Sequence, residues 1–394
     1  MVERAWGTRP TASQRWSGAW IGCCQGSSGD GCRASFAWRG SRSADRVRSR
    51  ACRPAFRSRL STPLCREHLG ARLRSSSYLH LSSWKPRGSY RLELTTDTGT
   101  RWHLIFKDER CSIKDIPALR TLPISPGPPE FAIYQMRQKA LSRFLPDLYW
   151  SREVERGHHF QYIMEDLGND FERITTERRD LTLAVEVLLQ LQAAMREALS
   201  HGGHRYLAVY DRQYSEDLLD YVLRNLEEYR AGRESSAIDA LCRNWQRVVD
   251  VPQRDEFYRH GLAAPIHGDY DHSNVLVHTH DRTRVRVVDW EWAGIGVPHA
   301  DLASLLKRVS PDDERAALAI FACGYSRLTA EEHLRPFRWC QLERRLLDAG
   351  FIARQQMLST RRLPRLDDFV RAAAADVLRT LGLLEAAPRR LAVA

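Results

Sequence analysis

The fold is decided by two stretches of sequence, Pro265-Ile-His-Gly-Asp-Tyr-Asp-His-Ser-Asn-Val-Leu-Val-His278 and Arg284-Val-Arg-Val-Val-Asp-Trp-Glu-Trp292. Their short β-branched runs flank a polar turn, which is the pattern of a β-hairpin. Such a hairpin places Asp269 and Asn274 at its entrance and Asp289 at its exit. Three oxygen-bearing side chains therefore meet at one end of it. A cluster of this kind suits Mg²⁺, which prefers hard oxygen ligands.

The order of these three residues along the chain is also the order found in phosphoryl-transfer sites. In such sites a base takes the proton of the acceptor hydroxyl, and an Asn followed by an Asp holds the metal. A single Asp in a loop is usually a turn former, so none of the three is informative alone. The joint pattern, with apolar strands between its members, indicates a kinase-like site.

The same stretch resembles the aminoglycoside phosphotransferase and choline kinase-like enzymes, which are relatives of the protein kinases. In that family the catalytic triplet reads His-Gly-Asp and the metal motif reads Asp-Trp-Glu or similar, as in His267-Gly-Asp269 and Asp289-Trp-Glu291 here. The resemblance covers roughly residues 78–384, and only residues 265–301 are specific. It implies a two-lobed, protein kinase-like α+β fold with a small antiparallel-sheet N-lobe and a large helical C-lobe. It also implies ATP and Mg²⁺ as cofactors.

The resemblance further implies a role for each residue of the motif. Asp269 is expected to orient the acceptor hydroxyl and take its proton, and Asn274 and Asp289 are expected to hold Mg²⁺. Phosphoryl transfer asks little of the protein beyond such positioning and charge stabilisation. His267 is expected to pack and hydrogen-bond, and Asp301 to tie the catalytic loop to the helix below it.

Two further acidic residues lie within this stretch. Asp271 is inside the loop and is expected to be a solvated turn residue. Glu291 follows Asp289 by two residues, so its side chain can point to the same side and support the metal site.

Three apolar runs upstream, residues 78–81, 89–95 and 102–107, predict the sheet of the N-lobe. Short connections join them, which favours consecutive antiparallel strands. The connection 82–88 lies where a kinase keeps its phosphate-covering loop. It contains a single Gly and carries little functional information.

Lys107 ends the third run, where an exposed Lys is common. By resemblance, however, it occupies the position of the Lys that grips the α- and β-phosphates. Its partner is expected on the next helix, which Pro128-Pro-Glu130 opens with Pro in the first turn and Glu at the positive end of the dipole. Apolar residues continue at core-facing spacing from Ile133 to Phe144. The sequence therefore predicts an ion pair between Lys107 and Glu130.

The run 160–167 is apolar, turns polar at its end and looks like the hinge between the lobes. By resemblance, the backbone groups of Glu165 and Leu167 pair with adenine. Met164 would then face the back of the nucleotide pocket, although a Met at a strand end usually belongs to the core.

Helical periodicity dominates the rest of the chain, in the stretches 179–195, 214–250 and 303–384. The length and this change of pattern predict an extension followed by two lobes. We divide the chain into an extension, an N-lobe that binds nucleotide, and a helical C-lobe with the catalytic loop and the acceptor site, at residues 1–77, 78–166 and 167–394.

The formal net charge of +11 belongs to the N-terminal extension alone. Residues 1–74 hold 15 Arg, no Lys and 4 acidic residues, whereas the remaining chain has 45 basic and 45 acidic residues. Because residues 1–77 are rich in Arg, Ser, Gly and Trp without periodicity, we expect them to be disordered. Three explanations stay open: a targeting peptide, a basic arm for nucleic acid, or sequence translated from an early start codon. The absence of Lys favours the third.

The nine cysteines form no Cys-x-x-Cys pair, and five of them lie in the extension. An odd number without a secretory signal favours a reducing cytosol. No apolar run approaches the roughly 18–20 residues of a membrane span. We therefore expect a cytoplasmic protein with no membrane partner.

Two other function classes stay open. One is a catalytically inactive kinase fold that binds a nucleotide or a partner, against which the intact motif residues argue. The other is a nucleic-acid-binding protein that acts only through residues 1–74. For the kinase interpretation, a site for polycationic aminoglycosides needs carboxylates, yet the chain from Asp301 onward has 12 acidic and 16 basic residues. Residues 211–255 are richer in acids, mostly at exposed helical positions. The sequence thus favours a neutral or singly charged hydroxylated small molecule as the acceptor.

Overall fold

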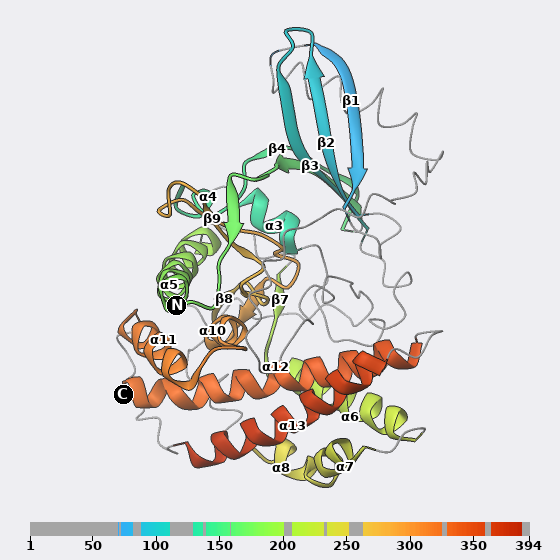
Figure 1. Cartoon of the computed structure of the whole chain (residues 1–394), viewed down its shortest axis with the longest axis vertical. Coiled ribbons are helices and arrows are strands. Elements are labelled where there is room, and N and C mark those ends of the chain that lie inside the picture. The colour runs from blue at the N-terminus through green and yellow to red at the C-terminus, as the bar shows by residue number, and fades with distance from the viewer. Residues whose placement is uncertain are drawn as a thin grey trace.

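The computed structural model has two lobes, with a sheet at one end and a layer of long helices at the other (Figure 1). This is the two-lobed α+β architecture that the sequence predicts. The structure describes most of the chain after the extension, namely residues 70, 72–81, 88–110, 129–136, 139–157, 159–200, 207–231, 235–251, 263–324, 329–358 and 364–387.

The N-lobe is built on a five-stranded sheet in which every neighbouring pair is antiparallel. Its strand order is β1-β2-β3-β5-β4. The strands are β1 (Leu73–His80), β2 (Ser89–Thr96), β3 (Arg101–Arg110), β4 (Leu148–Glu155) and β5 (His159–Glu165). Alternate residues of the central strands, such as Leu92, Leu104 and Ile163, are buried and form a small core of their own. The predicted succession of three antiparallel strands is confirmed.

Two strand boundaries differ from the prediction. Strand β1 begins at Leu73, inside the segment 1–77 that we expected to be disordered, because its register continues along β2 as far as Thr96. Strand β3 continues to Arg110, so Lys107 lies within the strand and not at its end. Residues 1–69 and the predicted phosphate-covering loop at 82–87 lie outside the described residues.

The helix expected after Pro128 is divided. Helix α3 (Pro129–Gln135) ends near Met136, and helix α4 (Lys139–Ser142) follows it. An apolar stripe is compatible with one helix or with two, because both pieces keep their apolar residues toward the core. Six consecutive residues of α3, from Pro129 to Tyr134, are buried, so the helix is enclosed on all sides and contributes to the larger core.

The predicted hairpin is present in the C-lobe. Strands β9 (Val275–His278) and β10 (Val285–Val287) pair antiparallel, and β6 (Phe171–Arg173) adds a third strand beside β9. A second small sheet has the order β7-β11-β8, with β7 at Ala208–Val209, β8 at Ala264–Ile266 and β11 at Gly294–Gly296. The two small sheets hold the start and the end of the catalytic motif.

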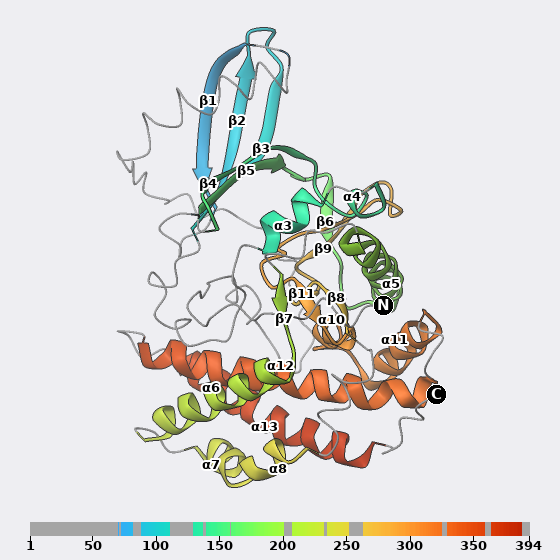
Figure 2. The ribbon, with the colours of Figure 1, turned by 180° about the vertical axis from the view of Figure 1, so that it is seen from behind.

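The C-lobe is otherwise helical, as the sequence predicts. Its described helices are α5 (Arg178–Ser200), α6 (Arg212–Arg230), α7 (Ser236–Arg243), α8 (Trp245–Val249), α10 (His299–Leu305), α11 (Pro311–Gly324), α12 (Ala330–Leu358) and α13 (Pro364–Ala386). Helix α12 is the longest of these and packs against α6, α10, α11 and α13 (Figure 2). It runs along the base of the site, between the catalytic loop and the last helix. None of the described helices is long and apolar enough to cross a membrane.

Candidate active site

The catalytic loop leaves strand β8 and is held from below by Asp301 on helix α10. The carboxylate of Asp301 accepts hydrogen bonds from the backbone amides of His267 (2.9 Å) and Gly268 (2.8 Å). Gly268 has a φ of 80°, and a Cβ at this position would collide with the carbonyl of Trp292. The loop therefore needs glycine here, both for its backbone conformation and for space. The contacts of Asp301 are those expected from the sequence.

His267 is fully buried and acts as a spacer inside the loop. Its Nδ1 accepts a hydrogen bond from the backbone amide of Asp269 (3.2 Å), so the proton of the neutral ring lies on Nε2, which donates to the carbonyl of Val288 (3.0 Å). Burial lowers the pKa of His267, which keeps the ring neutral. The expected packing and hydrogen-bonding role agrees with these contacts.

Asp269 is only 6 % exposed, and its carboxylate is held from two sides. Asn274 Nδ2 donates to the Asp269 carbonyl (2.8 Å) and to Asp269 Oδ2 (3.2 Å). On the other side, Arg344 Nη2 donates to Asp269 Oδ1. Burial raises the pKa of Asp269 above its usual range, and Arg344 opposes that rise.

Arg344 was missed by the sequence analysis. It lies on helix α12, 75 positions after Asp269, and its Nη1 also donates to the Gly268 carbonyl (3.0 Å). Nothing in the sequence distinguishes it from the other arginines of the same helix, because helical periodicity alone does not show which one faces the catalytic loop.

Asn274 and Asp289 come together because the hairpin ladder continues past its strands. The amide of Val288 donates to the carbonyl of Asn274 (3.0 Å), so Asp289 follows directly after a residue bonded to Asn274. Asp289 has a φ of 66°, and it is the one non-glycine residue with a positive φ in the described part of the chain. Such a conformation is uncommon for Asp, and strained backbone of this kind often lies at functional sites.

The two residues fit a magnesium ion. Asn274 Nδ2 points toward Asp269, so Asn274 Oδ1 points away from Asp269. Ser273 Oγ donates to this Oδ1 over a long distance of 3.3 Å. Asp289 directly follows Val288, whose amide is bonded to the Asn274 carbonyl, and Mg²⁺ usually binds through one or two carboxylates together with phosphate oxygens. Within the described ranges, no group of three or more His, Cys, Asp or Glu side chains is placed to hold a metal ion.

Lys107 and Glu130 form an ion pair in the N-lobe. Lys107 Nζ lies 2.7 Å from Glu130 Oε1 and 2.6 Å from Oε2, and Glu130 is 1 % exposed. Burial acts to lower the pKa of Lys107, but Glu130 and then Asp289 outweigh it and raise the pKa above its ordinary value. The lysine is therefore charged, and it lies within the electrostatic reach of Asp289 across the lobe boundary.

The two predicted hinge residues differ in their hydrogen bonds. The amide of Glu165 donates to the carbonyl of Asp147 (2.8 Å), and its carboxylate accepts from the Asp147 amide (3.2 Å). The carbonyl of Leu167 accepts from the Asp170 amide (3.3 Å), while its own amide donates to no partner among the described residues. Met164 is buried within the main core. The amide of Leu167 is thus the better placed of the two for a ligand.

Two further acidic residues, Asp271 and Glu291, lie in the same stretch of sequence. Asp271 Oδ1 accepts from the amide (2.7 Å) and the hydroxyl (2.5 Å) of Ser273, which is the role of a turn residue, as expected. Asp271 and Glu291 are both half-buried.

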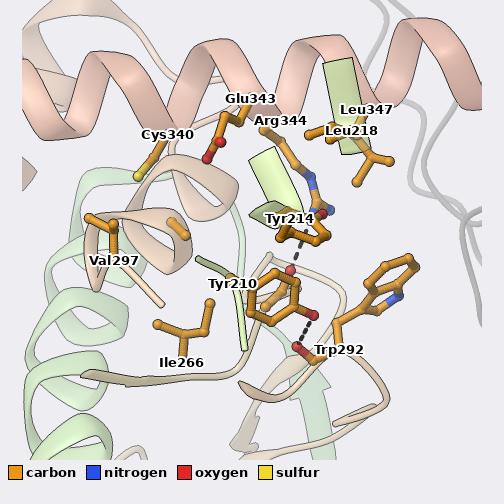
Figure 3. Close-up of a pocket in the computed structure, with 12 residues that line it drawn as sticks. Tyr210, Tyr214, Leu218, Ile266, Trp292, Val297, Cys340, Glu343, Arg344 and Leu347 are labelled. Atoms are coloured by element: carbon orange, nitrogen blue, oxygen red, sulfur yellow. Dashed lines mark hydrogen bonds between the residues drawn. The ribbon is translucent and has the colours of Figure 1, made fainter. Parts of the chain in front are cut away.

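A pocket opens beside the catalytic loop, between helices α6 and α12 (Figure 3). The hydroxyl of Tyr210 donates to the carbonyl of Trp292 (2.7 Å), and the rings of Tyr210 and Tyr214 meet edge to face at 4.7 Å. The pocket is mostly apolar and aromatic, with one acidic and one basic side chain, and its lining residues are Tyr210, Tyr214, Leu218, Ile266, Gly268, Trp292, Val297, Ala300, Cys340, Glu343, Arg344 and Leu347. Because Gly268 and Arg344 belong to it, the pocket lies directly against Asp269.

Comparisons with known proteins identify the family and the fold. Residues 128–337, more than half of the chain, match the model of a family described as "phosphotransferase enzyme family". No curated protein sequence matches the chain.

Three solved kinase structures have similar folds. Choline kinase from Cryptosporidium parvum Iowa II is 8 % identical with a TM-score of 0.54, and the match covers 82 % of this chain and 95 % of that one. A microcompartment-associated aminopropanol kinase is 16 % identical with a TM-score of 0.53, covering 80 % and 94 %. A mutant aminoglycoside 2'-phosphotransferase in complex with GDP is 14 % identical with a TM-score of 0.50, covering 82 % and 97 %. At such identities the likeness establishes the fold.

Proposed function

Since this chain belongs to the phosphotransferase enzyme family, we propose that it transfers the γ-phosphoryl group of ATP, with Mg²⁺, to a hydroxyl group of a small molecule. The observation that carries the proposal is the buried carboxylate of Asp269, held between Asn274 and Arg344, next to a pocket that Gly268 and Arg344 line. A carboxylate there can meet a hydroxyl that lies in the pocket.

In this proposal Asp269 is the base. Each carboxylate oxygen has two acceptor positions, and the contacts of Asp269 occupy one on Oδ1 and one on Oδ2. An acceptor hydroxyl can therefore donate its proton to Asp269 without displacing Asn274 or Arg344. As the proton moves to the carboxylate, the acceptor oxygen bonds to the γ-phosphorus, and the bond from that phosphorus to the β–γ bridging oxygen breaks, which leaves ADP.

Asn274 Oδ1 and Asp289 are the groups that would hold Mg²⁺. The bound ion supplies positive charge to the phosphate oxygens of the nucleotide. Lys107 adds a second positive charge, which Glu130 holds in place. The two cationic groups suit the developing charge of a transferred phosphoryl group better than either would alone.

The nucleotide base is proposed to lie at the end of strand β5. The amide of Leu167, which has no partner within the described part of the chain, supports this placement, with the backbone of Glu165 as its neighbour. A site that consumes ATP also favours the cytoplasm as the place of action. We keep residues 1–77 outside the proposed catalytic unit except for the part of strand β1 that starts at Leu73.

The pocket favours a neutral or singly charged acceptor. Among its lining residues Glu343 is the one carboxylate, and Arg344 brings a positive charge close to the reacting hydroxyl. A polycation would meet that charge with few acidic groups to offset it. Aromatic walls from Tyr210, Tyr214 and Trp292 suit the flat face of a ring.

An ATP-consumption screen with Mg²⁺ tests the proposal, using hydroxylated metabolites, amino alcohols, macrolides and aminoglycosides as acceptors. We expect saturable ADP formation with at least one neutral or singly charged alcohol, lost in the Asp269→Asn variant. If Mg-ATP binds but no acceptor is phosphorylated, the inactive nucleotide-binding alternative gains support. Use of polyamine antibiotics alone would contradict the acceptor preference and leave the kinase assignment intact.

A further inference from the structure

Arg91 lies on the face of the N-lobe sheet that also carries Lys107. It pairs with Ile105 on β3, which pairs in turn with Met164 on β5. Directly paired residues of neighbouring strands point to the same face of a sheet. Lys107 is two positions after Ile105 on β3, so its side chain points to this face as well. A cross-strand row of side chains therefore leads from Arg91 to the end of β5, beside the proposed phosphate-binding lysine.

The guanidinium group of Arg91 binds the carboxylate of Asp166, which precedes Leu167 at the hinge. Arg91 Nε lies 2.6 Å from Asp166 Oδ2, and Arg91 Nη2 donates to Asp166 Oδ1 (3.2 Å). Asp166 Oδ1 also accepts a hydrogen bond from the amide of Gly168 (3.1 Å). Two bonds between a guanidinium and one carboxylate fix the orientation of both groups. The pair thus connects strand β2 to the hinge, although β3 separates β2 from β5 in the sheet.

A tie between the sheet and the hinge explains only part of this arrangement. The side chain of Arg91 is 46 % exposed, whereas that of Asp166 is 6 % exposed. An ion pair with an exposed partner adds little to stability. Both bonds to Asp166 lie at the edge of the guanidinium group, so the carboxylate leaves the flat faces of that group uncovered. An arginine that is fixed at this edge and remains half exposed can stack on an aromatic ring.

The proposed nucleotide site brings such a ring. The amide of Leu167, next to Asp166, has no partner within the described part of the chain and is proposed to bond to the base. Lys107, on the same face as Arg91, is proposed to bind the phosphates. A nucleotide that spans these two groups places its base at the hinge, where Asp166 holds the guanidinium of Arg91.

We propose that Arg91 is a further nucleotide-binding residue of this site, whose guanidinium, held by Asp166, stacks on the base. This inference rests on the proposed function, which places a base at the end of β5. The contribution of Arg91 depends on the base of the ligand and not on its phosphates, and that difference can be measured.

Calorimetry with Mg-ATP and with Mg-tripolyphosphate tests the inference, because the second ligand has the phosphates without the base. In Arg91→Gln we expect the Kd of Mg-ATP to rise about fivefold, as for the loss of a cation–π contact of ordinary strength, and the Kd of Mg-tripolyphosphate to stay within about twofold of the wild-type value. If Arg91→Gln does not fold, Arg91→Thr takes its place, since Thr is favoured in strands.

Arg152→Gln is the matched control. Arg152 is an exposed arginine of the same sheet whose Nε and Nη2 both donate to Gln161 Oε1, at 2.9 and 2.7 Å. It pairs with Gln161, which pairs with Asp108, so it lies on the face opposite to Lys107. Its loss should leave the Kd of both ligands unchanged. An equal loss of Mg-ATP affinity in Arg152→Gln would overturn the inference.

An unchanged Kd of Mg-ATP in Arg91→Gln would also overturn it, as would an equal rise for Mg-tripolyphosphate, because Arg91 would then act on the phosphates or on the fold. If tripolyphosphate binds too weakly to measure, salt decides. A contact with the base keeps the ratio of variant to wild-type Kd for Mg-ATP at high salt, whereas a charge effect on the phosphates is screened and that ratio falls toward one. A wild type that binds no Mg-ATP contradicts the proposed function itself, and this inference with it.

Discussion

Each lobe has a buried ion pair at the site. The side chain with the proposed function is positive in one pair and negative in the other, and in both pairs the partner compensates its charge. In the N-lobe the group that we propose to bind the nucleotide is the cation Lys107, and its partner carboxylate, Glu130, is 1 % exposed. In the C-lobe the group that we propose as the base is the carboxylate of Asp269, and Arg344 is its partner. A buried group keeps its charge only when a counter-charge is held beside it. The fold meets this requirement twice, once at the proposed phosphate-binding lysine and once at the proposed base.

The largest effect is expected when the charge of Asp269 is removed. Asp269→Asn retains the shape of the side chain and cannot take a proton, so turnover should fall by on the order of 100-fold or more. Nucleotide affinity should stay near the wild-type value, because Lys107 and Asp289 are untouched. Steady-state kinetics and calorimetry with Mg-ATP measure the two quantities. Near-normal turnover would mean that Asp269 is not the base.

Removing the carboxylate of Asp289 should give the next largest effect. Asp289→Ala deletes a proposed metal ligand, and we expect Mg²⁺-dependent nucleotide affinity to fall by at least about tenfold, since loss of even a supporting ligand costs about 10- to 100-fold in metal affinity. Asp289 also helps to keep Lys107 charged. Calorimetry with and without Mg²⁺ separates the two contributions. An unchanged Mg²⁺-dependent affinity in Asp289→Ala would place the metal elsewhere.

The contribution of the Lys107–Glu130 pair can be measured through the free energy of unfolding of variants. Lys107→Met leaves Glu130 buried without its counter-charge and should lower the free energy of unfolding by about 3 kcal/mol. The double change Lys107→Met with Glu130→Leu removes both charges and should recover most of that loss, while nucleotide affinity stays weak. Denaturant unfolding of the single and double variants checks this. If the double variant is as unstable as the single one, packing and not charge sets the cost.

The smallest effect is expected for truncations at the N-terminus, which leave both ion pairs unchanged. A chain that begins at residue 70 keeps all of strand β1, whereas one that begins at residue 78 loses Leu73 to Ser77 and their pairing with β2. The longer fragment should melt with the full chain, and the shorter one slightly lower, since about 1 kcal/mol corresponds to roughly 2–4 °C for chains of about 150–250 residues and to less for longer chains. Thermal melting of the three proteins measures this. A drop in the longer fragment would assign a structural role to the extension.

The distance between the site residues along the chain explains which of them could be predicted from the sequence. The motif residues Asp269, Asn274 and Asp289 lie within 21 positions of one another and on one hairpin, so local patterns found them together. Lys107 and Glu130 are separated by 23 positions, and the likeness to known kinases suggested their pairing. Predicting the sheet, the hairpin and the long helices required only periodicity.

Arg344 could not be found in this way. It is separated from Asp269 by 75 positions, and which arginine of α12 faces the loop depends on how that helix is rotated in the lobe. The break after helix α3 and the early start of strand β1 escaped for a related reason. Both depend on packing and pairing with other elements, which local propensity does not contain.

The close approach of Gly268 to the carbonyl of Trp292 divides the site into a part that tolerates variation and a part that does not. Any side chain at position 268 would push the loop away from its partner, so a saturation library at this position should return only glycine among active clones. Other lining residues are helical, such as Tyr214 and Leu218 on α6 and Leu347 on α12, and lie outside the catalytic loop. Under the proposed function, we therefore expect that substitutions on α6 and α12 can select new acceptor preferences without a change in the chemistry of transfer.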